Sequence, residues 1–142
     1  MHITWLASVA LIALSAFGQQ TNTDELKQVL AQQQAAWNRG DLEAFMQTYS
    51  KSDELTFFSG NTIIHGWRPT LERYRKKYQA EGAQMGILSF TEMQVTMLGP
   101  DGAMVTARWH LAMPDGKKRE GLTTVICVRS AVSWKIIHDH SS

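Results

Sequence analysis

The chain has 142 residues, of which 44% are hydrophobic, and its 14 basic and 13 acidic residues give a formal net charge of +1. This length suffices for one domain with a substantial core, and the balanced charge argues against a nucleic-acid-binding surface, which needs a clustered excess of positive charge. One basic run, over residues 73–77, shares its segment with Glu72 and Glu81, a pattern typical of a solvated helix face.

The single cysteine and several absent motifs limit the chemistry. Cys127 lies in an apolar run, which predicts a small buried side chain rather than a reactive thiolate, and one cysteine allows no intramolecular disulfide. The sequence contains no glycine-rich phosphate loop, no Cys-x-x-Cys, no Gly-x-Ser-x-Gly and no His-Glu-x-x-His. Nucleotide, dithiol, serine-hydrolase and zinc-protease chemistry are therefore disfavoured, and we expect no cofactor.

The first 18 residues resemble a secretory signal peptide. Residues 5–14 form an uncharged apolar run too short to span a bilayer comfortably, and Ala16-Phe17-Gly18 provides a small-residue cleavage site. The segment before the run has His2 but no Lys or Arg, so an uncleaved anchor is the alternative. We expect a secreted or periplasmic protein that is not membrane-bound after cleavage.

Two helices joined by a tight corner are predicted to open the folded domain, which spans residues 21–142. Thr21–Glu25 has the capping and acidic side chains of a helix start, and apolar residues then recur at helical spacing as far as Trp37. Gly40 is predicted to end this helix, and Asp41 to cap a second helix whose apolar stripe reaches Tyr49. A hairpin over residues 55–65 and a third helix from Trp67 to Tyr78 follow, with Pro69 tolerated in the first turn.

From Met85 onward the hydrophobic pattern has the two-residue period of strands. The phase slips between Thr91 and Met93, which predicts a β-bulge. Strands are then predicted over residues 103–111, 120–128 and 134–141, separated by turns. Helices followed by antiparallel strands indicate an α+β fold with the helices on one side of a curved sheet.

The turns suggest a register. If Met113 pairs with Lys118, Trp109 lies opposite Leu122. If Val128 pairs with Trp134, one face of the sheet carries Trp109 together with Trp134, Ile136, His138 and His140. Asp139 then lies on the opposite face, with Arg108. A slip of one residue at the second turn would exchange the two sets.

The chain resembles the SnoaL-like families, including the domain of unknown function DUF4440, within the NTF2-like (cystatin-like) cone superfamily. The residues that carry the resemblance are Ala36–Phe45 at the helix corner, His65-Gly66-Trp67, Ala107-Arg108-Trp109 and Trp134–Ser141. The last motif is also similar to the end of the association domain of calcium/calmodulin-dependent kinases. The resemblance implies three helices packed on a strongly curved antiparallel sheet, a central pocket and a homodimer formed through the sheet.

The resemblance also implies acid–base chemistry by a carboxylate, a histidine or a tyrosine inside the cone. The candidates for catalysis are His138, Asp139 and His140, with the alternative that these groups only fix neighbouring strands. Two histidines on one strand face could bind a metal, but no third ligand is placed by spacing, so no metal is predicted. Arg108 could bind an anionic ligand or pair with Asp139.

The candidate ligand-binding residues are aromatic or basic side chains on inward-facing stripes, with core packing as the alternative for each aromatic one: Tyr49, Phe57, Trp67, Tyr74, Arg108 and Trp109. The sequence therefore predicts a domain that binds a small, mostly apolar molecule. If it is catalytic, we expect cofactor-independent isomerisation, cyclisation or dehydration. The alternative is a non-catalytic association or accessory module that dimerises through its sheet.

Overall fold

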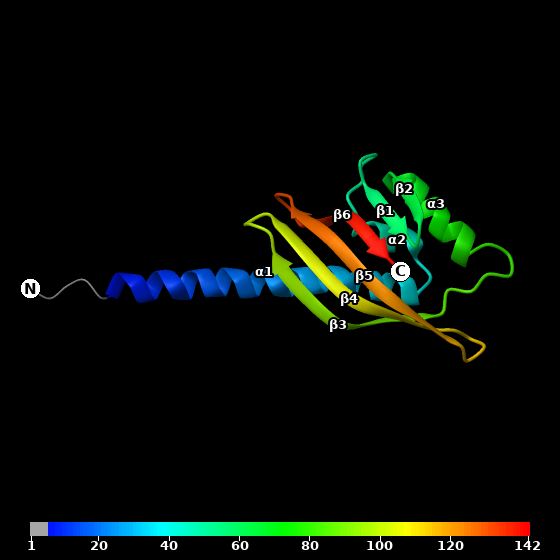
Figure 1. Cartoon of the computed structure of the whole chain (residues 1–142), viewed down its shortest axis with the longest axis horizontal. Coiled ribbons are helices and arrows are strands. Elements are labelled where there is room, and N and C mark those ends of the chain that lie inside the picture. Colours follow the sequence, from blue (N-terminus) through cyan, green and yellow to red (C-terminus); the bar gives the residue numbers. More distant parts are fainter. Residues whose placement is uncertain (1–5) are drawn as a thin grey trace, which may run out of the picture.

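The computed structural model describes the backbone of residues 6–142 and the side chains of residues 16–142. These residues form three helices and six strands (Figure 1): α1 (Leu6–Asn38), α2 (Leu42–Met46), β1 (Thr56–Ser59), β2 (Thr62–His65), α3 (Trp67–Tyr78), β3 (Ile87–Met97), β4 (Gly102–Ala112), β5 (Lys118–Arg129) and β6 (Trp134–Ser141). The strands make one sheet in the order β2-β1-β6-β5-β4-β3. Residues 1–5, at the start of the predicted signal peptide (residues 1–18), lie outside the described residues.

Helix α1 runs without a break through the predicted helix start at Thr21–Glu25, so that prediction is wrong. Thr21 and Asp24, which were predicted to cap the helix, instead make contacts typical of a helix interior. The Thr21 hydroxyl donates to the Phe17 carbonyl, and Asp24 accepts from Gln20, each four residues away. Within the described residues, no helix combines the length and the apolarity needed to cross a membrane.

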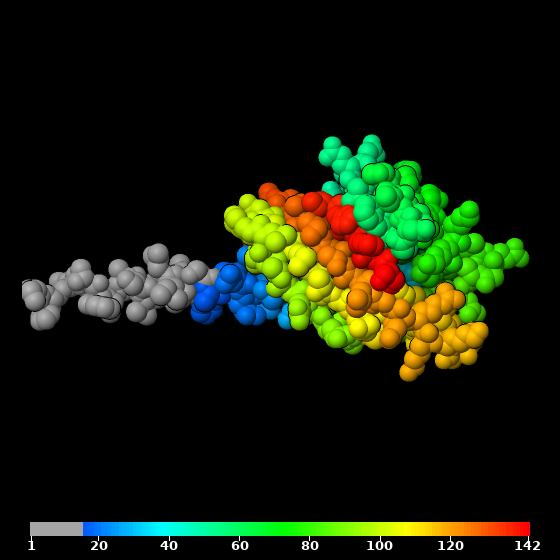
Figure 2. Space-filling view, in the orientation of Figure 1, coloured from blue at the N-terminus to red at the C-terminus, as the bar shows by residue number. Residues whose placement is uncertain are grey.

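The core lies between the sheet and the C-terminal half of α1. Along β4, Ala103, Val105, Ala107 and Leu111 are buried on the face that packs against the helices, which we call the inner face. Arg108 and His110 lie on the opposite, outer face. Figure 2 shows the outer face of β3 to β6, in yellow-green to red, with none of the described helices over it.

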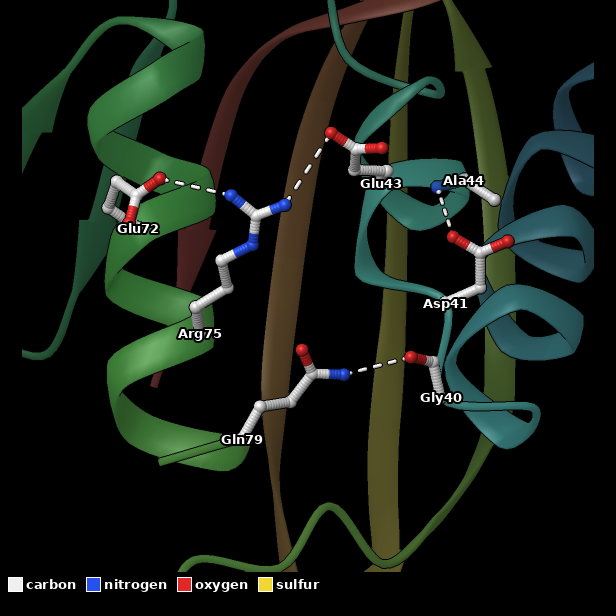
Figure 3. A network of polar contacts seen from close by, with 7 residues as sticks. All are labelled: Gly40, Asp41, Glu43, Ala44, Glu72, Arg75 and Gln79. Atoms are coloured by element: carbon white, nitrogen blue, oxygen red, sulfur yellow. Dashed lines mark hydrogen bonds and ion pairs between the residues drawn. The ribbon is translucent and has the colours of Figure 1, made fainter. Parts of the chain in front are cut away.

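Helix α3 is tied to the corner between α1 and α2 by polar contacts (Figure 3). Asp41 caps α2 as predicted, because its carboxylate accepts from the Ala44 backbone N–H at 2.9 Å. Gln79 donates to the Gly40 carbonyl at 2.8 Å, and Arg75 lies 3.5 Å from Glu43. Although exposed ion pairs contribute little, together these contacts connect α3 to the corner at two points.

The sheet is mixed, so the prediction of an antiparallel sheet is wrong for one pair. Strand β1 runs parallel to β6, with Thr56 opposite His138. Helix α2 ends at Met46, before the end of the predicted stripe, and Tyr49 then forms an isolated parallel bridge with Ile136. The chain thus enters β1 alongside β6 and in its direction. The β-bulge expected near Thr91 is confirmed, between Thr91 and Gln94.

The first predicted register is wrong by one residue. Met113 pairs with Lys117 across a three-residue turn in which Gly116 has φ of 81°, so Trp109 lies opposite Gly121 rather than Leu122. Glycine is needed there, because a Cβ at position 121 would lie 2.7 Å from Cζ2 of the Trp109 indole. Thr123, Val125 and Cys127 therefore point to the inner face with Trp109.

The predicted pairing of β5 with β6 is also wrong by one residue, and a β-bulge shifts the register by one more residue. Arg129 pairs with Trp134, which returns Trp134 and Ile136 to the inner face. The register then shifts after Ile136, where the parallel neighbour of β6 changes from Tyr49 to β1. Because of this bulge, Asp139 faces inward, whereas His138 and His140 face outward, the reverse of the predicted arrangement.

Candidate functional site

A cavity of about 300 Å³ lies between the inner face of the sheet and the helices. Its walls are mostly apolar and aromatic, from Leu30, Trp37, Phe45, Phe57, Tyr78, Leu88, Phe90, Trp109, Leu111 and Val125. Polar groups border it at two ends. Tyr49 and Asp139 are buried, whereas Lys77 and Glu120 are exposed to solvent. The cavity is thus an apolar chamber with a buried polar end and an exposed polar end.

Asp139 is the centre of the buried end. It is 4% exposed, and its carboxylate accepts hydrogen bonds from Tyr49 at 2.6 Å, Ser141 at 2.8 Å and Thr123 at 3.2 Å. Burial raises the pKa of this carboxyl above its usual range, while the three hydroxyl donors partly oppose the rise. A buried carboxyl with a raised pKa, beside an open cavity, is suited to taking up and returning a proton.

Two tyrosines complete the buried end. Tyr49 is 2% exposed, and burial followed by the charge of Asp139 raises the pKa of its phenol well above the usual value. Tyr74 reaches the cavity from α3, and burial is also the main cause that raises the pKa of its phenol. Each phenol is close enough to influence the pKa of the other. Both therefore stay protonated near neutral pH and act as hydrogen-bond donors.

Five of the predicted site residues line this cavity: Tyr49, Phe57, Tyr74, Trp109 and Asp139. The predicted ligand-binding residue Trp67 does not border it. The Trp67 indole is buried at the start of α3, where its N–H donates to the Met46 carbonyl at 2.7 Å. It joins α3 to α2.

The remaining predicted residues, Arg108, His138 and His140, lie on the outer face. Arg108 lies 2.5 Å from Glu92, so the alternative in which it pairs with Asp139 is wrong. The His138 ring shares a 2.6 Å hydrogen bond with Thr56, and both histidine rings pack edge-on against Phe58. Within residues 16–142, no group of three His, Cys, Asp or Glu side chains is placed to hold a metal ion.

Several cavity residues were not predicted from the sequence. Gln33 from α1 and Thr123 and Ser141 from the sheet add polar groups. The half-buried Arg73 and the exposed Lys77 from α3 also border the cavity. The two basic residues flank Tyr74 and Tyr78, the predicted buried stripe of the helix. This spacing could have indicated that Arg73 and Lys77 lie beside the cavity, because the residues next to a buried helical stripe lie at its edge.

Comparisons with known proteins agree with this architecture. A family model described as SnoaL-like domain matches residues 26–142. The structure of an NTF-2 like protein of unknown function from Shewanella oneidensis MR-1 is 37% identical, with a TM-score of 0.79 over 85% of this chain and 98% of that chain. No curated protein matches the chain.

More distant structures share the fold alone. A nuclear transport factor 2 (NTF2-like) superfamily protein from Salmonella enterica serovar Typhimurium LT2 is 18% identical, with a TM-score of 0.73 over 87% of this chain and 92% of that chain. A putative scytalone dehydratase from Novosphingobium aromaticivorans is 10% identical, with a TM-score of 0.71 over 89% and 86%. The narrower resemblances, to DUF4440 and to the kinase association domain, stay predictions. The chain belongs to the SnoaL-like domain family and has the NTF2-like, or cystatin-like, fold.

Proposed function

We propose that this protein binds a small, mostly apolar molecule in the cavity and moves a proton on it with Asp139. One observation carries the proposal: the buried carboxyl of Asp139, held by Tyr49 at 2.6 Å, borders an otherwise apolar cavity. A carboxyl in such a place is costly for folding, and enzymes use groups of this kind as acids and bases. Of the three predicted catalytic residues, only Asp139 keeps the proposed acid–base role, because His138 and His140 face outward.

The proposed reaction is cofactor-independent and begins at a carbon next to a carbonyl. The carboxylate of Asp139 removes the proton from this carbon, and the electron pair of the C–H bond moves toward the carbonyl oxygen. The Tyr74 phenol stabilises the resulting oxyanion by donating a hydrogen bond, since its raised pKa keeps it protonated. Where a C=C bond adjoins this carbon, the electron pair is shared along both double bonds. Protonated Asp139 then returns the proton to the far carbon of that C=C bond, the double bond moves next to the carbonyl and the carbonyl re-forms, which completes an isomerisation.

Cyclisation and dehydration are variants of the same chemistry. If the enolate carbon attacks a second carbonyl of the same molecule, a C–C bond closes the ring and the new alkoxide takes the proton from Asp139. If the enolate instead expels a hydroxyl group from the next carbon, a C=C bond forms and protonated Asp139 gives the proton with which the hydroxyl leaves as water. The putative scytalone dehydratase with the same fold supports including dehydration in the set. The shared requirements are a base, a phenol donor and exclusion of bulk water.

The test is proton exchange on a bound ketone. A screen of small hydrophobic ketones and acids for thermal stabilisation first selects ligands, and deuterium uptake at the carbon beside the carbonyl is then followed by NMR. We expect Asp139→Asn to slow enzymatic exchange by about 10²- to 10⁴-fold. His140→Asn, on the outer face, is the matched control and should exchange at the wild-type rate. Exchange by Asp139→Asn at the wild-type rate would overturn the proposal.

A homodimer through the outer face is proposed with this function, and it is also the basis of the alternative association module. Leu122, opposite Arg108 on the outer face, is 54% exposed. Light scattering after gel filtration should give twice the mass of one chain for the wild type and the mass of one chain for Leu122→Glu. A wild type with the mass of a single chain contradicts the dimer.

We further propose that residues 1–18 are cleaved and that the mature protein is secreted or periplasmic. The apolar run and the Ala16-Phe17-Gly18 site support this proposal. N-terminal sequencing of the protein recovered from the native host should find a start just after Gly18. A start at Met1 would favour the anchored alternative.

A further inference from the structure

Two cations from α3 border the cavity, the exposed Lys77 and the half-buried Arg73. Arg73 and Lys77 are one helical turn apart, and both border the cavity. Both also border a second, more open hollow, together with Ile64 of β2 and Lys76 of α3. The entrance to the cavity is therefore edged by positive charge.

These two cations differ from their neighbour Arg75. Arg75 lies 3.1 Å from Glu72 and 3.5 Å from Glu43, and Figure 3 shows its guanidinium held between the two carboxylates. Within residues 16–142, neither Arg73 nor Lys77 has a carboxylate within the 4.0 Å that defines an ion pair. Lys77 Nζ lies 5.2 Å from the centroid of the Tyr78 ring, which also lines the cavity, and neither the charge of Arg73 nor that of Lys77 is neutralised by an acid of the described residues.

The acids that border the cavity are engaged elsewhere. The carboxylate of Glu120 lies 3.1 Å from the His110 ring on the outer face. Asp139 accepts three hydrogen bonds at the buried end. A ligand thus meets an acidic group at the buried end of the cavity and basic groups at the exposed end, with apolar walls between them.

From this polarity we infer that the ligand is an amphipathic acid: an apolar ring or short chain with one carboxylate, which Arg73 and Lys77 bind at the exposed end. The inference rests on the proposed function and specifies its substrate class. The guanidinium of Arg73 can bind a carboxylate through two hydrogen bonds, and Lys77 adds a point charge. Asp139 repels the anionic end, so the carboxylate points outward and the apolar, carbonyl-bearing end points to Asp139 and Tyr74.

The size of the cavity limits the apolar part. About 300 Å³ is at the lower end of the range for small-molecule pockets, roughly 300–1,000 Å³. The aromatic side chains that line the cavity favour flat, apolar ligand groups, because aromatic rings pack well against one another. We therefore expect a keto acid with one or two rings rather than a larger polycyclic or lipid-like molecule.

The test compares matched charged and neutral probes. Phenyl, cyclohexyl and naphthyl keto acids and their methyl esters are titrated calorimetrically into the wild-type protein at low and high salt. We expect at least one acid to bind about tenfold more tightly than its ester. Added salt should reduce this difference. Equal affinity for acid and ester throughout the series, or no binding of any acid, would overturn the inference.

Variants on one helix identify the residues. Arg73→Gln and Lys77→Gln should each weaken binding of the acid about tenfold and leave the ester unchanged. Arg75→Gln and Arg68→Gln remove the same charge from α3 away from the cavity and should change acid binding by less than about twofold. Equal weakening by all four variants would mean that only the overall charge of the helix matters, which also contradicts the inference.

The outcome is distinguishable from failure of the proposed proton transfer. Deuterium uptake is measured for the neutral methyl esters, which do not need Arg73 or Lys77. If Asp139 catalyses uptake on an ester while acids show no preference, the proton transfer stands and the inference about the carboxylate is wrong. If acids bind through Arg73 and Lys77 but uptake is the same in Asp139→Asn, the inference about binding stands and the proposed reaction is wrong.

Discussion

Tyr49 and Asp139 are 90 positions apart in the sequence, yet the tyrosine hydroxyl donates a 2.6 Å hydrogen bond to the carboxylate at the buried end of the cavity. Tyr49 follows α2 and bridges to Ile136, three residues before Asp139. The bond therefore joins the helical corner to the last strand.

Tyr49→Phe should destabilise the protein, because it removes one of three donors from a buried carboxylate. We expect a loss of about 1–3 kcal/mol in the free energy of unfolding, measured by urea denaturation. The hydrogen bond from Tyr49 lowers the pKa of Asp139, so its loss should raise that pKa further. The acidic limb of any pH–rate profile should accordingly move to higher pH. Tyr78→Phe, which alters another phenol at the cavity, is the control, and an equal effect on the profile would contradict this role.

Asp139→Asn should change how stability depends on pH. The folded-state pKa of Asp139 is raised above its value of about 3.9 in the unfolded chain. Between the two values the folded state binds more protons, so the wild type loses stability as the pH rises through this window, and the loss persists above it. The stability of Asp139→Asn relative to wild type should therefore increase from about pH 4 upward until the folded-state pKa is passed. A difference that is independent of pH would show that Asp139 does not titrate in this way.

Local chemistry was sufficient to predict much of the fold. The Asp41 cap, the hairpin of β1 and β2, the start of α3 at Trp67 and the bulge after Thr91 depend on residues close in sequence. The predicted start at Thr21 failed because Thr and Asp also fit inside a helix when their side chains find partners four residues away. Composition alone did not distinguish these two uses.

The buried end of the cavity depends on contacts between distant residues. The face of Asp139 is set by two turn lengths and by a bulge at the point where β6 exchanges Tyr49 for β1 as its neighbour. No spacing within β6 indicates this exchange. The sequence therefore indicated Asp139 as a candidate and predicted that it lies on a different face from His138 and His140. It predicted the wrong face for all three residues, because Asp139 faces inward and the histidines face outward.

Arg108→Ala should have little effect on stability or on ligand binding. Arg108 pairs with Glu92 on the outer face, where the two side chains are 35% and 65% exposed. Exposed pairs of this kind contribute roughly 0–1 kcal/mol. In the Leu122→Glu background, where the proposed dimer does not form, Arg108→Ala should therefore lower the free energy of unfolding by no more than about 1 kcal/mol. The affinity of any cavity ligand should be unchanged in calorimetric titrations. A large loss of affinity would require Arg108 to act on the cavity from the other side of the sheet.

Cys127 should be unreactive in the folded protein. It is fully buried on the inner face, and burial together with the charge of Asp139 raises the pKa of its thiol to about 12. Since the thiolate is the reactive form, labelling by an aromatic disulfide at pH 8 should be far slower than for free cysteine. The rate should rise to that of free cysteine in denaturing urea, so labelling reports the opening of the sheet beside Asp139. Labelling of the folded wild type at the rate of free cysteine would show that the core around Cys127 is open to solvent.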